Sequence, residues 1–131
     1  MKDDPVKVFI TYSWDDKAHK KWVRLFADEL LSNGIDVTID QYDVELGDRL
    51  PHFMEKSIAE ATYVLVVCTP NYKIKADRRN GGVGYESHLI SGELIMNGSE
   101  KKYIPILRRG TIEDAIPSYL IGKYAYDLSE C

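Results

Sequence analysis

Cysteine and histidine are scarce in this chain of 131 residues, which has two cysteines and three histidines. Cys68 stands inside an apolar run and Cys131 is the last residue, so their spacing fits neither a disulfide framework nor a metal site. Metal binding requires clustered ligands, and the sequence shows no cluster with metal-ligand spacing. We therefore expect no metal and no disulfide, in keeping with a reducing compartment.

Long hydrophobic runs are missing too. No apolar stretch approaches the roughly 20 residues that span a bilayer. The first residues, Met1 to Pro5, hold no hydrophobic region that could serve as a signal peptide. These two absences predict a cytoplasmic protein with no contact to a membrane.

An excess of positive charge is also absent, because the formal net charge is -4. Proteins dedicated to nucleic acids usually carry an obvious basic face. Local basic pairs such as Lys20-Lys21 and Arg108-Arg109 fall in different expected elements, so we interpret them as solvated edges and helix faces. The sequence predicts no direct contact with nucleic acid.

The remaining composition is that of one globular domain. Apolar residues make up 44% and charged residues 29%, near the average for folded proteins. A chain of this length can bury about two-thirds of the surface of its unfolded form, which one core can achieve. We predict a single domain over residues 1–131.

Five short segments read as strands because they are rich in β-branched, aromatic and other apolar residues. Tyr63 to Cys68 is continuously apolar, as a central parallel strand covered on both faces would be. The expected strands are residues 6–12, 35–39, 63–68, 103–107 and 124–128.

Helical patterns separate these strands. The first follows Ser13 to Asp16, which offers a capping-box-like start, and ends at Asn33-Gly34. The second begins at Leu50-Pro51 and runs to about Ala61, and the third runs from about Tyr85 to Met96. Between Thr69-Pro70 and Gly82 we expect a long polar loop, and a short crossover containing Pro117 before the last strand.

Strands alternating with helices predict a flavodoxin-like α/β fold with three layers. Its five parallel strands would have the order 2-1-3-4-5, with right-handed crossovers and helices on both faces. In such a sheet, ligands bind beyond the carboxyl ends of the first and third strands, where the winding reverses. The candidate ligand-binding loops are therefore Tyr12 to Asp16 and Thr69 to Glu86.

Several known occupants of this fold are excluded by their motifs. Gly81 to Gly84 matches neither the dinucleotide fingerprint nor the phosphate loop. The third strand ends in Cys68-Thr69-Pro70, without the aspartate that a phosphorelay receiver needs. The histidines at 19, 52 and 88 have no nucleophile elbow nearby, so we interpret them as surface or packing residues, with only His88 near the expected crevice.

One carboxylate remains in this crevice, Glu86 at the start of the third helix. An acid in a first helical turn interacts favourably with the helix dipole, by ~0.3–1 kcal/mol, with no further role. Alternatively, a carboxylate can stabilise positive charge on a sugar ring as its glycosidic bond breaks. Nicotinamide leaves ribose as a neutral molecule, so one carboxylate could suffice to cleave NAD. Glu93 is either a second acid or an exposed helix residue. The residues alone leave these alternatives open.

Three segments together resemble TIR domains and their relatives, the SEFIR domains, and the likeness extends from Val8 to Leu128. Residues 8–16 resemble the first-strand motif, and residues 61–72 resemble the third strand with its Ser/Thr-Pro exit. The loop of residues 40–49 resembles the variable loop through which TIR domains associate. The self-association residues implied are Asp43, Glu45, Leu46, Gly47, Asp48 and Arg49.

The resemblance implies an NAD glycohydrolase or cyclase, with NAD as substrate and no cofactor. Tyr85-Glu86 falls where enzymatic TIR domains carry their catalytic glutamate, so Glu86 becomes the catalytic residue. The substrate-binding residues implied are Tyr12, Ser13, Trp14 and Tyr85. Gly82 replaces a tryptophan that many active members have, so an aromatic wall for nicotinamide has to come from Trp14 or Tyr85.

The resemblance also implies a biological setting. The approach to Tyr85-Glu86 is most similar to TIR modules of prokaryotic antiviral effectors, which fits a module excised from a longer protein with a sensor domain. Activity would require self-association, and the product could be linear or cyclic ADP-ribose. The alternative is a non-enzymatic TIR or SEFIR module that binds other proteins in signalling.

Overall fold

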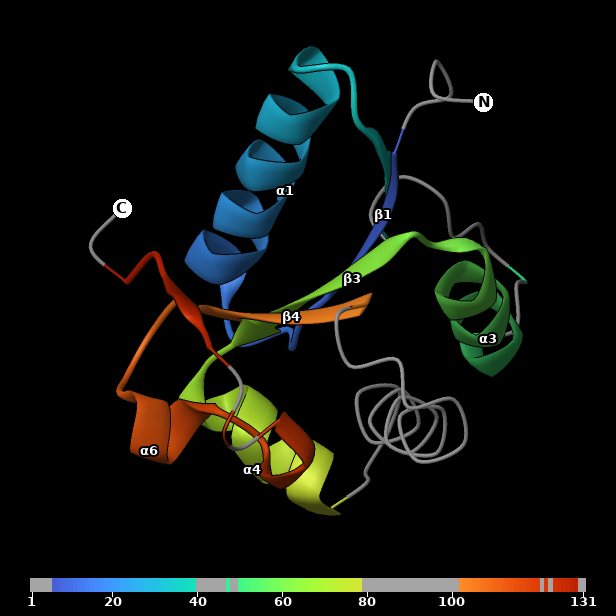
Figure 1. The fold of residues 1–131 in the computed structure, drawn as a ribbon. Helices are drawn as coiled ribbons and strands as arrows, with labels where there is room; N and C mark the ends of the chain where they lie inside the picture. Colours follow the sequence, from blue (N-terminus) through green and yellow to red (C-terminus); the bar gives the residue numbers. More distant parts are fainter. Residues whose placement is uncertain are drawn as a thin grey trace.

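A single parallel sheet organises the chain (Figure 1). The structure is a computed structural model that describes residues 6–39, 47, 50–78, 102–120, 122 and 124–129. The strand order is β2-β1-β3-β4-β5, which confirms the predicted order and fold class. The strands are β1 (Lys7–Thr11), β2 (Asp36–Thr38), β3 (Tyr63–Cys68), β4 (Tyr103–Leu107) and β5 (Tyr126–Asp127).

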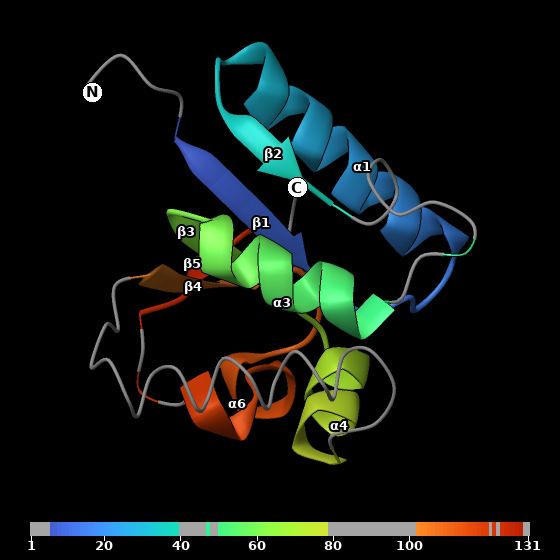
Figure 2. The same ribbon diagram turned by 90° about the vertical axis from the view of Figure 1, so that its right-hand side faces the viewer.

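Helices cover both faces of this sheet (Figure 2). On one face lies α1 (Lys17–Ser32). On the other lie α3 (Leu50–Glu60), α4 (Pro70–Arg78), the short α6 (Ile112–Ala115) and the 3₁₀ helix η2 (Ser118–Leu120). None of the helices in the described ranges has both the length and the apolar character needed to cross a membrane.

Two cores result from the alternation of side chains along the strands. Val8, Ile10 and Tyr12 point toward α1, and Phe9 points toward α3. Burying one such apolar side chain stabilises the fold by roughly 1.5–3 kcal/mol. Because β3 is continuously apolar, it contributes to both cores, as its sequence predicts: Val64 and Val66 face one side, and Val67 faces the other.

The ends of α1 are set by local hydrogen bonds. Asp16 is the N-cap residue, and its carboxylate accepts a hydrogen bond from the backbone N–H of His19 at 2.7 Å. At the other end, the N–H of Ile35 bonds to the carbonyl of Leu30 at 3.2 Å, across a residue, Gly34, whose φ is +86°. Asp16, the last residue of the predicted capping segment, is therefore the one that begins the helix.

The prediction of a long polar loop directly after β3 is wrong, because residues 70–78 form the helix α4. Thr69 caps this helix by accepting a hydrogen bond from the N–H of Tyr72 at 3.1 Å, and Pro70 occupies the first helical position, where proline is tolerated. Among residues 70–77, whose burial the structure describes, only Tyr72 and Ala76 are buried. This narrow apolar stripe is hard to recognise among the polar residues of the segment.

Two exposed glycines with similar backbone geometry give a matched test of the packing between α4 and the turn after β4. A methyl group at Gly110 (φ +80°) would lie 2.5 Å from Asp114 Oδ1 and 2.8 Å from Pro70 Cγ, whereas one at Gly34 (φ +86°) meets no atom of the described residues within 4 Å. Both alanine substitutions force an unfavourable φ, which costs about 1 kcal/mol. We expect Gly110→Ala to lower the free energy of unfolding by a further 1–2 kcal/mol or so, measured by urea denaturation. Equal losses in the two variants would contradict this packing.

Candidate functional site

The candidate site lies where β1 and β3 run side by side in the sheet and their carboxyl ends meet. This is the point at which the winding of the sheet reverses, since β2 lies beyond β1 and β4 lies beyond β3. Four polar side chains follow the two strands there. We call them the edge cluster: Ser13, Asp15, Thr69 and Asn71.

Hydrogen bonds join the members of the edge cluster across the two loops. The hydroxyl of Ser13 donates to Asp15 Oδ1 and lies 3.3 Å from the hydroxyl of Thr69. Asn71 Nδ2 also donates to Asp15 Oδ1, at 2.8 Å. Ser13 and Thr69 are completely buried, so the contact between their hydroxyls is shielded from water, whereas Asp15 and Asn71 are half-buried. The cluster therefore holds the carboxylate of Asp15 in a fixed position.

The second oxygen of this carboxylate, Oδ2, has a different environment. Both hydrogen bonds to Asp15 end on Oδ1, and Oδ2 has no bonding partner among the residues that the structure describes. The Asp15 side chain is half-buried. A positioned carboxylate oxygen with this exposure can accept hydrogen bonds from a ligand, for example from the hydroxyl groups of a sugar.

The three predicted binding residues of the first loop differ in their access to a ligand. Trp14 is 55% exposed, with the ammonium group of Lys20 over its ring at 4.8 Å from the centroid. Ser13 is buried within the edge cluster, and Tyr12 is buried in the core beneath α1. Trp14 is therefore the member of the three that a ligand can reach, on the part of its ring that Lys20 does not cover, whereas Ser13 can act by holding Asp15.

His19 lies at this end of the sheet but inside the core, and His88, the histidine expected near the crevice, lies outside the described residues. Its ring packs edge-on against Tyr12, with centroids 6.1 Å apart, and is completely buried. Neither ring nitrogen has a hydrogen-bond partner within the described ranges. The pKa of His19 is lowered, mainly because the ring is buried. Its neutral form is therefore favoured. The prediction of a packing histidine is consistent with this position.

An ion pair ties the start of α1 to the turn after β4. Arg109 Nη1 and Nη2 donate to the two carboxylate oxygens of Asp16 at 2.9 and 3.3 Å. This pair, followed by the hydrogen bond from the N–H of His19, lowers the pKa of Asp16 to about 2. The same contact raises the pKa of Arg109. The first loop is thus attached to β4 as well as to β3.

The titration of Asp16 should report this contact directly. Because the folded pKa is below the ordinary value of 3.8, the stabilisation is present above pH 3.8 and is lost as the pH falls through about 2. Carboxyl-carbon NMR should give a midpoint near 2 in the wild type. Arg109→Met should raise it part of the way to 3.8, since the bond from His19 remains. Lys21→Met, on the exposed face of α1, should leave the midpoint unchanged, and an unchanged midpoint in Arg109→Met would refute the pairing.

The other predicted site residues lie outside the described residues. These are Tyr85 and Glu86, and all of the self-association residues except Gly47. Gly47 is exposed and has a φ of +93°, a backbone conformation that glycine adopts readily. The roles assigned to these residues stay predictions.

Comparison with known proteins identifies the family. A profile described as TIR domain matches residues 8–130. This chain belongs to the TIR domain family. The crystal structure of a prokaryotic SEFIR domain is also similar, with 36% sequence identity and a TM-score of 0.74, and the likeness covers 92% of this chain and 85% of that one. The expected membership of the TIR and SEFIR group is confirmed. A comparison with curated proteins found no match.

More distant solved structures share the fold of this TIR domain. The TIR domain of the Toll-related receptor TRR-2 from Hydra magnipapillata is 19% identical with a TM-score of 0.66, covering 94% of this chain and 84% of that chain. The TIR domains of the activated Roq1 resistosome, which recognises the pathogen effector XopQ, are 20% identical with a TM-score of 0.59, covering 78% of this chain and 57% of that chain. At these identities the likeness establishes the fold alone.

Proposed function

We propose that this TIR domain cleaves the bond between nicotinamide and ribose in NAD. In the hydrolytic reaction the bond between C1 of the ribose and the pyridine nitrogen breaks, and its electron pair leaves with neutral nicotinamide. Water then adds to C1 and releases a proton, which gives ADP-ribose. An internal nucleophile of ADP-ribose in place of water would give the cyclic product.

The observation that carries this proposal is the positioned carboxylate of Asp15 beside the exposed ring of Trp14. A dinucleotide needs hydrogen-bond acceptors for its ribose hydroxyls and a flat apolar surface for a base or a pyridine ring. Asp15 Oδ2 supplies the first and Trp14 supplies the second, both at the reversal point of the sheet, where ligands bind in this architecture. Trp14 is then the aromatic wall that Gly82 does not provide.

Glu86 is the proposed catalytic residue, on the ground of its place in the sequence. Its carboxylate would stabilise the positive charge that develops on the ribose as nicotinamide leaves. Asp15 would hold the ribose hydroxyls, and the buried hydroxyl of Ser13 would keep Asp15 in place. Electrostatic stabilisation of this kind typically accelerates a reaction by roughly 10²–10³-fold per group.

We further propose that self-association is needed for the reaction, through the loop around Gly47. The test is release of nicotinamide from NAD by protein that is dilute, concentrated, or fused to a multimerising tag. Release per molecule of protein should rise steeply with concentration, and the tag should make it independent of concentration. Absence of nicotinamide under every assembling condition would rule out NAD cleavage.

The second candidate is a protein-binding module without enzymatic activity. The observation that favours it is the 36% identity to a prokaryotic SEFIR domain over 92% of this chain. In that case Glu86 is an acid that favours the start of a helix, and the edge cluster is structural. Assembly without nicotinamide release would support this candidate, so the same experiment separates the two functions.

A further inference from the structure

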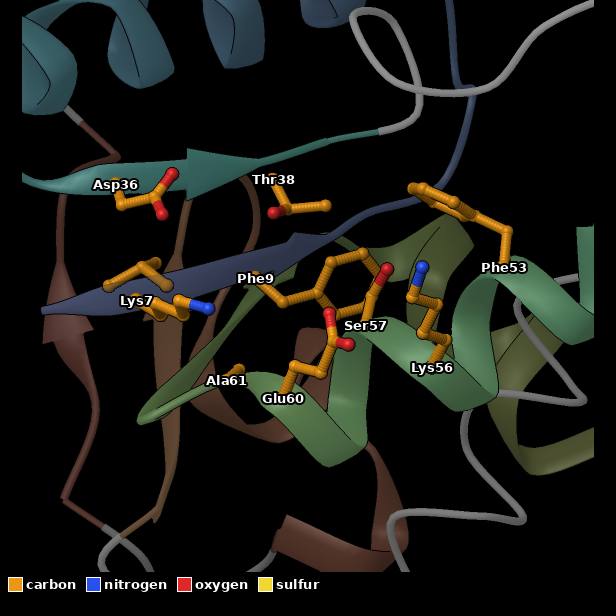
Figure 3. A pocket seen from close by; sticks show the side chains of 10 residues that line it. Lys7, Phe9, Asp36, Thr38, Phe53, Lys56, Ser57, Glu60 and Ala61 are labelled. Atoms are coloured by element: carbon orange, nitrogen blue, oxygen red, sulfur yellow. The ribbon is translucent and has the colours of Figure 1, made fainter.

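A cavity lies away from the edge cluster, between the β2 edge of the sheet and α3 (Figure 3). Its volume is about 290 Å³, and we call it the β2–α3 cavity. One wall is formed by β1 and β2, and the other by one face of α3. The side chains used below are Lys7, Phe9, Asp36, Phe53, Lys56, Ser57 and Glu60.

The charges in this cavity are separated into two ends. Lys7 pairs in register with Asp36, and the end of α3 lies beside them because the N–H of Thr62 bonds to the carbonyl of Lys7 at 2.7 Å. Glu60, near the same end of α3, therefore joins Lys7 and Asp36 at an end with a net charge of about -1. Lys56, one helical turn earlier, gives the other end its positive charge.

These charged side chains are not neutralised by one another. No ion pair or hydrogen bond joins the side chains of Lys7, Asp36, Lys56 and Glu60 to any other residue within the described ranges. Figure 3 shows the ammonium group of Lys56 and the carboxylate of Glu60 pointing from α3 toward the strands. A ligand could therefore bind both kinds of group without displacing an existing ion pair.

An uncharged polar group and an apolar floor complete the site. Ser57 is 9% exposed, its hydroxyl points into the cavity beside Lys56, and it forms no side-chain hydrogen bond to another described residue. The floor is Phe9, whose ring meets that of Phe53 edge-on, with centroids 6.1 Å apart. This hydroxyl can therefore form a hydrogen bond with a ligand in the cavity.

We propose that the β2–α3 cavity binds a small zwitterion of the amino-acid type. Its ammonium group lies between Asp36 and Glu60, its carboxylate binds Lys56 and the hydroxyl of Ser57, and its apolar side chain covers Phe9 and Phe53. A cavity of this size is at the lower limit of small-molecule sites, which span roughly 300–1,000 Å³, so an amino acid fits and a dinucleotide does not. The site is independent of NAD cleavage.

The test uses L-leucine as the probe, with N-acetyl-L-leucine and L-leucinamide as analogues that each lack one charge. Calorimetry should show saturable binding of L-leucine, and its presence should raise the melting temperature because it binds only the folded protein. Each analogue should bind at least roughly tenfold more weakly, since a charged hydrogen bond is lost.

Matched variants connect this binding to the cavity. Lys56→Met and Glu60→Gln should each weaken L-leucine binding at least roughly tenfold. Glu60→Gln should not weaken the binding of N-acetyl-L-leucine, because that analogue has no ammonium group for Glu60 to bind. The side chains of Lys56 and Glu60 are exposed, as are those of the two control residues named next. All four variants should therefore melt near the wild type when no ligand is present. The controls are Lys21→Met and Glu29→Gln on α1, which should bind L-leucine normally.

Two results would overturn the proposal. One is the absence of L-leucine binding to the wild type at millimolar concentration. The other is equal affinity of the wild type, Lys56→Met and Glu60→Gln for L-leucine, which would place the ligand elsewhere. Neither result bears on NAD cleavage, because these side chains do not belong to the edge cluster.

Discussion

Replacement of Glu86 by alanine should lower the rate of nicotinamide release from NAD by at least roughly a hundredfold. The proposed role of this carboxylate is to stabilise charge that exists only in the transition state, so its loss should reduce kcat more than it changes KM. The measurement is nicotinamide released over time by wild type and Glu86→Ala, both fused to the same multimerising tag.

Glu29→Ala is the matched control for that measurement. Glu29 lies on the exposed surface of α1, so the same change of residue type is made far from the carboxyl edge of the sheet. Its activity should equal that of the wild type. If Glu86→Ala and Glu29→Ala are equally active, NAD cleavage remains but Glu86 has no part in it.

Asp15→Asn should lower kcat/KM for NAD by roughly 10–100-fold while the protein keeps its fold. Asparagine has the same shape, and its side-chain oxygen can still accept from Ser13 and Asn71, but the negative charge facing the ribose hydroxyls is gone. Loss of one hydrogen bond to a charged group accounts for this range. The measurement is the concentration dependence of nicotinamide release.

Asp15→Ala provides a contrast in stability. It removes the oxygen that accepts from the hydroxyl of Ser13 and from Asn71 Nδ2, and each such hydrogen bond contributes roughly 0.5–1.5 kcal/mol. Urea denaturation should therefore show a clear loss in Asp15→Ala and little change in Asp15→Asn. Wild-type kinetics in Asp15→Asn would remove Asp15 from substrate binding and leave it a structural role only.

The arrangement of the sheet was predictable because each strand has a local signature. Tyr63 to Cys68 is apolar throughout, so it had to be covered on both faces, and α1 is evident from its spacing of apolar residues and its end at Gly34. Three strands, β1, β2 and β5, are shorter than predicted. Tyr126–Asp127 is exposed, and only these two residues of the expected 124–128 pair with β4. Strand ends depend on pairing with neighbours, which local sequence does not determine.

Helix α4 was missed because its stability is mainly tertiary. It begins with a cap from Thr69, and it is joined to the segment around Ile116 by Lys73, whose ammonium group donates to the carbonyl of that residue at 3.1 Å. Lys73 also pairs with Asp77 at 3.4 Å. Bonds to residues some 40 positions away cannot be recognised from the composition of the helix itself.

The candidate site was located by topology, and its members were only partly predictable. The first loop and Thr69 follow from the strand order, since the ends of β1 and β3 must meet. The roles of Asp15, Asn71 and Arg109 were missed because each depends on a partner in another loop. The sequence held one signal for this cluster. Three polar side chains that can form hydrogen bonds, those of Ser13, Asp15 and Asn71, all lie within a few residues of the ends of β1 and β3.

The most direct test of the proposed NAD site uses the two tryptophans of the chain. Trp14 is exposed next to the edge cluster, whereas Trp22 is stacked on Phe26 and covered by the guanidinium group of Arg108, 4.6 Å from its centroid. Both can be labelled with 5-fluorotryptophan and followed by fluorine NMR in Glu86→Ala, which should bind NAD without consuming it.

Addition of NAD should shift the fluorine signal of Trp14 and leave that of Trp22 in place. Trp14→Phe and Trp22→Phe assign the two signals. If neither signal moves at NAD concentrations that support nicotinamide release by the wild type, or if only that of Trp22 moves, NAD does not bind at the carboxyl edge of β1 and β3.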